Sequence, residues 1–310
     1  MDDQRVRSRI APTPSGYLHL GNVFSFVLTW LLAKQHGGSV RLRIDDLDAE
    51  RVRIEYLEDI FRTLEFIGLQ PDEGPSGVQD HLEDHSQLLR MHVYEEKLEQ
   101  LKDRGLLYAC DCSRKKIRED AGDGHCPGNC RDRGLSFDLE NTAWRIRVPE
   151  GVIIHITDAL KKDRVAADLF GQMGDFIVRR RDGRPAYQVA SLCDDLLYNI
   201  NMVVRGEDLL GSTAAQIFLG GALHAGAFEH IQWVHHPLIG DEKNAKLSKS
   251  AGHTSIKWMI SQGLNPSGLF DRLVPFLNIR PGTYQNILEL KDGWSAQNYL
   301  RRKEGEHWSA

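Results

Sequence analysis

The stretch that decides the fold is RIAPTPSGYLHLGN, residues 9–22, which joins a predicted first strand to a predicted first helix. The residues before it, RVRSRIA, are typical of a strand, and GNVFSFVLTWLLAKQHGG from residue 21 onward is typical of a helix closed by a glycine pair. Next, SVRLRIDDLD (residues 39–48) alternates apolar residues and ends in three carboxylates. A strand, loop, helix and strand in this order predict the parallel sheet of an α/β protein.

The loop at residues 9–22 has the composition of a phosphate-binding turn. In open parallel sheets, ligands bind beyond the carboxyl ends of the strands, where the N-terminus of the next helix attracts an anion. Gly16 and Gly21 would let the backbone approach a phosphate, and His19 could donate a hydrogen bond to it. A proline-stiffened surface turn explains the same residues, so the loop alone leaves both interpretations open.

Length and composition indicate a globular protein without a membrane span. The 310 residues are 41% hydrophobic and 27% charged, which is enough for one large or two modest cores. The apolar run at residues 23–33 is shorter than the ~20 residues that a span needs, and no leader precedes it. We therefore expect a cytoplasmic protein with no membrane partner, and we expect a monomer.

The charge balance does not favour general binding to nucleic acid. Because the formal net charge is −5, any RNA must be held by local basic patches. Two candidates are RKKIR at residues 114–118 and RRR at residues 179–181. Solvated faces explain both stretches equally well.

A second candidate phosphate-binding stretch is KLSKS, residues 246–250. Lys246 and Lys249 could bring two ammonium groups onto a polyphosphate. Taken alone, the stretch is explained as well by a solvated loop. Phosphoryl chemistry needs charge neutralisation on the leaving group more than a covalent catalyst, so a histidine loop and a lysine loop on one sheet complement each other.

Four of the five cysteines, Cys110, Cys112, Cys126 and Cys130, are crowded into a charged, glycine-rich region that resembles an insertion with little core of its own. Four thiolates around a tetrahedral zinc ion would organise such a region. Free buried thiols are the alternative, and His125 could replace one ligand. The fifth, Cys193, lies in a predicted apolar strand and is expected to be a core residue.

The motifs PTPSGYLHLGN and KLSKS resemble the two signature motifs of class I aminoacyl-tRNA synthetases, and the stretches between them resemble the glutamyl branch. The resemblance implies an α/β fold with a Rossmann-type parallel sheet, an inserted zinc-bearing connective region and a short helical C-terminal segment. The implied parts are residues 1–105 and 185–250 for the two halves of the catalytic domain, 106–184 for the insertion, and 251–310 for a C-terminal segment in place of an anticodon-binding domain.

The resemblance also implies an amino-acid pocket for L-glutamate. An arginine fork matches a carboxylate in two hydrogen bonds, and two arginines could supply it. Asp45 would meet the α-ammonium, although the glutamyl branch commonly has Glu there. Tyr187 would add a hydroxyl and an aromatic wall, but a core tyrosine on a strand is the alternative. The implied pocket residues are Arg9, Ala11, Thr13, Asp45, Tyr187 and Arg205.

For ATP with Mg²⁺, the resemblance implies catalytic roles for His19, Lys246 and Lys249, with Gly21 and Asn22 also meeting the triphosphate. No dedicated Mg²⁺ ligand stands out in the sequence. The family also has a short branch, in which the zinc ligands are usually three Cys and a Tyr. In this sequence Cys126 stands at the Tyr position.

The resemblance is greatest to a short branch that transfers activated glutamate to queuosine in the anticodon of tRNA(Asp). Two alternatives come from other classes of function. One is a truncated glutamyl enzyme that charges a tRNA 3′ end. The other is a non-catalytic protein that binds an amino acid or RNA, which the presence of His19 and Lys249 disfavours.

Overall fold

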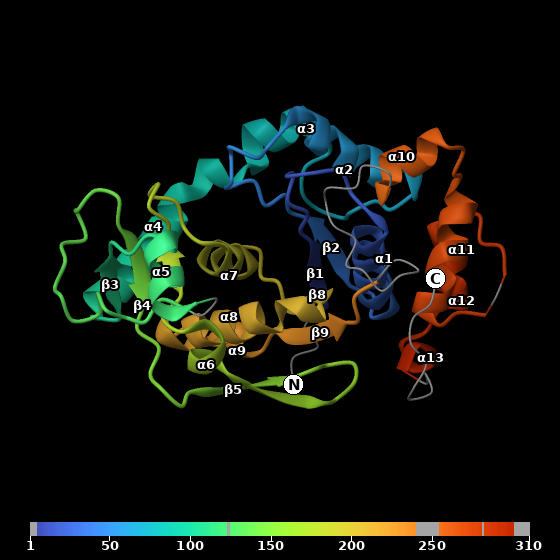
Figure 1. Ribbon diagram of the computed structural model, residues 1–310. Coiled ribbons are helices and arrows are strands. Elements are labelled where there is room, and N and C mark those ends of the chain that lie inside the picture. The colour runs from blue at the N-terminus through green and yellow to red at the C-terminus, as the bar shows by residue number, and fades with distance from the viewer. Residues whose placement is uncertain (1–4, 123–124, 240–253, 281, 301–310) are drawn as a thin grey trace.

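The computed structural model describes residues 5–122, 125–239, 254–280 and 282–300. In Figure 1, β3, β4 and α5 lie at one end of the molecule, α1, α11 and α12 at the other, and α7 and α8 between them. The first elements are β1 (Arg7–Ile10), α1 (Leu20–Gln35), β2 (Ser39–Leu42), α2 (Ile54–Phe66), α3 (Val78–Asp80), a π-helical turn (His81–His85), a 3-10 turn (Gln87–Arg90) and α4 (Met91–Asp103).

The middle of the chain carries most of the strands. Its elements are β3 (Leu107–Cys110), α5 (Arg114–Ala121), β4 (Ala143–Ile146), β5 (Ile153–Thr157), β6 (Arg164–Asp168), α6 (Leu169–Met173), β7 (Ile177–Arg179) and α7 (Tyr187–Leu197). The last part contains β8 (Met202–Gly206), a 3-10 turn (Glu207–Leu209), α8 (Leu210–Ala222), α9 (Gly226–Glu229), β9 (Gln232–His236), α10 (Ile256–Ser261), α11 (Pro266–Leu277), α12 (Ile287–Gly293) and α13 (Ala296–Leu300).

Two parallel strand pairs form the centre of the fold. β1 pairs with β2, and β8 pairs with β9, both in parallel. The two pairs are joined side by side, because the backbone N–H of Arg7 donates to the Asn201 side chain at 2.7 Å and the Ser8 hydroxyl donates to the Met202 carbonyl at 2.9 Å. The carboxyl ends of β1 and β8 therefore lie close together. The other sheets are antiparallel, in the orders β3-β4-β7 and β5-β6.

The predicted first helix is confirmed as α1, which begins directly after the loop. Its apolar residues are buried on almost every side, since it packs against β1, β2 and β8 within one large core cluster. Gly37 ends the helix with φ +61°. Gly38 follows so close to the first strand that a Cβ there would lie 2.4 Å from the Val6 carbonyl oxygen.

The expectation that Tyr187 and Cys193 lie in a strand is wrong. The strand β7 ends at Arg179, a turn at Gly183 (φ +83°) follows, and the helix α7 begins at Tyr187 itself. The apolar run is buried on the faces that meet α4 and α8, and a short continuous apolar run fits a buried helix as well as a buried strand.

The cysteine-rich region shares the core of its neighbours. All four residues of β4 are buried, and Trp144 and Ile146 belong to a second large core cluster that also includes residues of α4, α7 and α8. The four clustered cysteines form a small third cluster with Tyr108. Among the described residues, no helix is long and apolar enough to cross a membrane.

Candidate active site

A cavity of about 670 Å³ lies at the carboxyl ends of β1, β8 and β9. This volume is typical of a small-molecule site. Its walls come from the loop after β1, the first turns of α1, the end of β8 and the residues after β9. Eight predicted site residues line it together: Arg9, Ala11, Thr13, His19, Gly21, Asn22, Tyr187 and Arg205. Asp45 does not line it, and Lys246 and Lys249 lie outside the described residues.

His19 stands at the N-cap of α1, where the helix begins against the cavity. Its backbone N–H donates to the Asn22 side-chain oxygen at 3.0 Å, and the Asn22 N–H donates to the His19 carbonyl at 3.0 Å. Gly21 leaves room for the imidazole, because a Cβ at Gly21 would lie 3.2 Å from His19 Cε1. The positive end of the α1 dipole and the histidine ring therefore face the same cavity, which is an arrangement suited to an anion.

The described residues on either side of residues 240–253, which contain the two lysines, lie at or beside this cavity. Leu238 and Ile239, the last described residues before residue 240, line the cavity. Beyond residue 253, Ser255 forms a β-bridge with His19, and the N–H of Ile256 donates to the Leu18 carbonyl at 2.8 Å.

Two guanidinium groups also line the cavity. Arg9 Nε donates to Asp195 Oδ1 at 3.1 Å, and both side chains are buried. Arg205 comes from β8, and burial lowers the pKa of its guanidinium. Tyr187, at the first position of α7, is 39% exposed and also lines the cavity. These residues therefore offer cationic donors and a phenol to an anionic ligand.

Asp45 differs from its expected role. Its two carboxylate oxygens accept from Arg43 Nε at 2.7 Å and Nη2 at 3.1 Å. Burial raises the pKa of Asp45, although Arg43 opposes the shift. The carboxylate therefore pairs with a neighbour on its own chain segment and does not face the cavity.

A buried ionic network behind the cavity was not found from the sequence. Arg43 Nη1 donates to Asp195 Oδ1 at 2.7 Å, and Arg90 donates to both oxygens of Asp194 at 2.7 and 2.9 Å. Burial alone would raise the pKa of Asp194, but the hydrogen bonds and charge of Arg90 and the charge of Arg43 lower it overall. The paired acids at 194–195 were a visible signal, but their partners are far away in the sequence.

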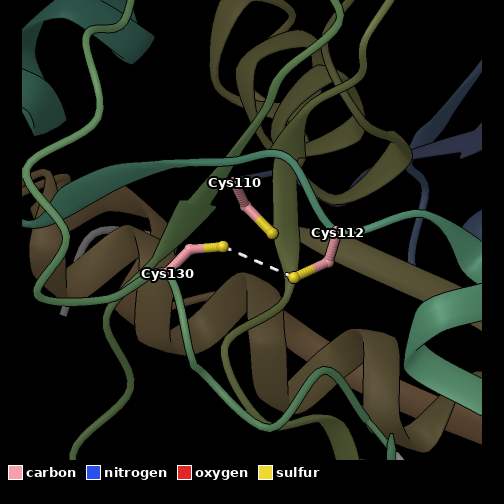
Figure 2. Close-up of side chains that lie close together, drawn as sticks. All are labelled: Cys110, Cys112 and Cys130. Carbon is pink, nitrogen blue, oxygen red and sulfur yellow. Dashed lines mark hydrogen bonds between the residues drawn. The ribbon is translucent and has the colours of Figure 1, made fainter. Parts of the chain in front are cut away.

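The four clustered cysteines are buried, and all have free thiols. Cys110, Cys112 and Cys130 have sulfur atoms within 4.8 Å of one another, as Figure 2 shows. The Cys112 and Cys130 sulfurs are 3.4 Å apart, and the Cys126 sulfur is 4.0 Å from that of Cys110. A tetrahedral zinc–thiolate site with bonds of about 2.3 Å has sulfurs roughly 3.8 Å apart, so the Cys110, Cys112 and Cys130 thiols could hold such an ion, and Cys126 lies next to Cys110 but outside this group of three.

Two other residues, His125 and Cys193, lie outside this cluster. The His125 ring lies 3.3 Å from the Gly171 carbonyl oxygen and is not part of the group of possible metal ligands. Cys193 is buried in the second large core cluster, and burial raises its pKa to about 12. Its expected place in the core is confirmed, although it lies on a helix.

The fold and the cavity are those expected of a class I synthetase catalytic domain, as the sequence resemblance implied. The family model described as "tRNA synthetases class I (E and Q), catalytic domain" matches residues 5–304, and the chain belongs to this family. Among its relatives, the glutamyl-Q tRNA(Asp) synthetase of Cupriavidus metallidurans is 38% identical over 278 residues, which cover 87% of this chain and 83% of that protein. The protein of the same name from Nitratidesulfovibrio vulgaris is 34% identical over 289 residues, covering 89% and 87%.

Longer relatives match as well. The glutamate–tRNA ligase of Thermobifida fusca is 35% identical over 299 residues, which cover 94% of this chain and 59% of that protein. The crystal structure of a glutamate tRNA ligase from Elizabethkingia meningosepticum, in complex with its amino acid, superimposes with a TM-score of 0.77 at 24% identity, covering 95% of this chain and 66% of that chain. This structural likeness supports the fold.

Proposed function

We propose that this protein activates L-glutamate with ATP and transfers the glutamyl group to queuosine in the anticodon of tRNA(Asp). The observation that carries the first step is the cavity itself, whose lining includes two guanidinium groups and the His19 end of α1. The choice of acceptor is supported by the relatives named glutamyl-Q tRNA(Asp) synthetase, which match most of this chain.

At the amino-acid end, Arg9 and Arg205 bind the γ-carboxylate of glutamate. A neutral amide in that place would leave a buried guanidinium without a counter-charge, so the site prefers glutamate to glutamine. The Tyr187 hydroxyl adds a hydrogen bond, and Ala11 and Thr13 form the wall next to Arg9. Asp45 would meet the α-ammonium only if its carboxylate left Arg43.

At the nucleotide end, the α-carboxylate of glutamate attacks the α-phosphorus of ATP, glutamyl-adenylate forms and pyrophosphate leaves. The substrate supplies its own nucleophile, so the protein has to hold the reactants in line and stabilise charge. His19 donates a hydrogen bond to the phosphates at the start of α1, beside Gly21 and Asn22. Lys246 and Lys249 neutralise the leaving pyrophosphate, and Mg²⁺ accompanies the nucleotide.

In the second step, a hydroxyl of the queuosine cyclopentenediol attacks the glutamyl carbonyl, an ester forms and AMP leaves. Away from the cavity, Cys110, Cys112, Cys126 and Cys130 would hold a structural zinc ion. Such an ion contributes folding energy to the region around it and takes no part in the reaction.

Charging of a tRNA 3′ end is a second candidate, because the glutamate–tRNA ligase of Thermobifida fusca matches 94% of this chain. Both candidates share the activation step and differ in the acceptor. Queuosine-containing tRNA(Asp) and an unmodified transcript, each tested with its 3′ end blocked and with it open, separate them. Glutamate attached only to the queuosine-containing RNA supports the proposal, and attachment that requires an open 3′ end supports the alternative.

The activation step has its own test. Amino-acid-dependent exchange of pyrophosphate into ATP is measured with glutamate and with glutamine, with and without tRNA. A preference for glutamate is expected. An equal or faster rate with glutamine reverses the assignment of the pocket, and a complete lack of exchange favours a non-catalytic binding protein.

A further inference from the structure

Two neutral side chains on α8 accept hydrogen bonds from the Arg205 guanidinium outside the cavity lining. Nη2 of Arg205 donates to Thr213 Oγ1 at 2.6 Å and to Gln216 Oε1 at 2.9 Å. Thr213 and Gln216 are three residues apart on the helix, so they lie on the same face. Both are fully buried, and neither is among the residues that line the cavity.

Two more neighbours of Arg205, Trp233 and His235, are also neutral. Its guanidinium carbon lies 4.8 Å from the centre of the Trp233 ring, which orients the group without neutralising it. His235 lies beside Thr213, with 2.7 Å between Nε2 and Oγ1. Burial and the charge of Arg205 lower the pKa of His235 to about 4, so the ring is uncharged at neutral pH.

In the described part of the chain, no carboxylate is hydrogen-bonded to Arg205. Its Nε and Nη1 are buried and have no hydrogen-bond partner there. Asp195 is near enough to act on Arg205 through its charge, but its carboxylate is hydrogen-bonded to Arg9 and Arg43. A buried guanidinium without a paired charge is costly, and an incoming anion relieves that cost.

We propose that Gln216 is a specificity-determining residue: because its side chain is neutral, Arg205 keeps a positive charge that an anionic ligand side chain must balance. The inference rests on the proposed function, in which Arg205 receives the γ-carboxylate of glutamate. A carboxylate at position 216 would take over that pairing from inside the protein. The site would then repel a γ-carboxylate and accept the neutral amide of glutamine more readily.

The deciding variant is Gln216→Glu, which keeps the shape of the side chain and adds one negative charge. Amino-acid affinity is measured by calorimetry and activation by pyrophosphate exchange, with glutamate and glutamine. The ratio of kcat/KM for glutamate to that for glutamine is expected to fall on the order of 10- to 100-fold, as for loss of a charged hydrogen bond. Gln232→Glu is the matched control, since Gln232 is exposed at the start of β9 and outside the cavity lining.

Two further variants distinguish the effect of the added charge from a folding defect and from the loss of a hydrogen bond. Thr213→Asp brings a carboxylate from the other acceptor position, and it decides the question if Gln216→Glu does not fold. Gln216→Met removes the acceptor but stays neutral, so glutamate binding weakens while the preference for glutamate persists.

The outcomes distinguish this inference from the proposed function. Wild-type protein that prefers glutamate, together with an unchanged preference in both folded acidic variants, overturns the role of Gln216 alone. Wild-type protein that binds no glutamate overturns both. A reduced preference in the acidic variants, with Gln216→Met and Gln232→Glu still selective, supports the assignment.

Discussion

Asp195 holds Arg9 in the wall of the cavity although the two residues are 186 positions apart: Arg9 Nε donates to Asp195 Oδ1 at 3.1 Å. The same oxygen accepts from Arg43 Nη1 at 2.7 Å, and the carboxylate is fully buried. Asp195 thus fixes the direction of Arg9 from outside the cavity lining.

Asp195→Asn is therefore expected to raise KM for glutamate about 10-fold, because Arg9 loses its charged anchor, while kcat changes less. The free energy of unfolding should fall by about 1.5–3 kcal/mol, since Arg43 and Arg9 lose a shared buried counter-charge. Pyrophosphate exchange at varied glutamate and chemical denaturation measure the two effects. Asp271→Asn, on an exposed position of α11, is the control, and an unchanged KM would contradict the positioning role.

Lys249→Ala is expected to slow glutamyl-adenylate formation on the order of 10²-fold, because a charge-stabilising donor at the leaving pyrophosphate is lost. The thermal unfolding temperature should stay within error of the wild type. Single-turnover formation of adenylate gives the rate. The exposed Lys291, changed to Ala, controls for the loss of one surface charge, and an undiminished rate in Lys249→Ala would rule out the proposed role.

We expect the cysteine cluster to bind a zinc ion that stabilises the fold. Purified protein is expected to contain close to one zinc per chain by mass spectrometry of the metal, and a strong chelator is expected to lower the unfolding temperature. Cys112→Ser should reduce both the zinc content and the unfolding temperature. Cys193→Ala removes a buried thiol of the second core cluster, so it should cost stability and leave the zinc content unchanged. Equal zinc content in Cys112→Ser and the wild type would count against the site.

Because His235 is buried, we expect the free energy of unfolding to depend on pH below neutrality. An unfolded histidine takes up a proton near pH 6.5, whereas burial and Arg205 lower the pKa of folded His235 to about 4. Between these values the unfolded chain binds more protons, so the free energy of unfolding falls as pH falls from about 6.5 to 4.

Denaturation of the wild type and of His235→Gln at pH 7.5 and pH 4.5 checks this sign. The variant should lose less stability between the two pH values than the wild type. His230→Gln, at an exposed position, should behave as the wild type. Equal losses in all three proteins would show that His235 does not stay neutral in the fold.

Much of the site could be predicted because its residues belong to local patterns. The turn between the first strand and the first helix must lie at the carboxyl end of a parallel strand, which placed Arg9, His19 and Gly21 together before any contact was known. The spacing of the four cysteines likewise predicted that their sulfurs could meet. Both inferences need only chain geometry over a few residues or a short insertion.

The helix at Tyr187 shows where local reasoning stops. The run from 187 to 197 is apolar on more than one face, so its periodicity does not separate strand from helix. The run forms the helix α7, which packs against α4 and α8, and contacts with these distant elements are not visible in the local sequence.

The sequence by itself predicted the α/β class, the two candidate phosphate-binding stretches and the cysteine cluster, because each depends on residue types at short spacing, and the resemblance to the family added the two arginines of the pocket. Only the tertiary structure decided which charges are paired. Asp45 turned to Arg43, Asp195 joined Arg9 and Arg43, and Arg205 was left with neutral partners. Ion pairing in a buried site depends on which side chains arrive at one point from distant segments, and on the cost of burying each charge alone.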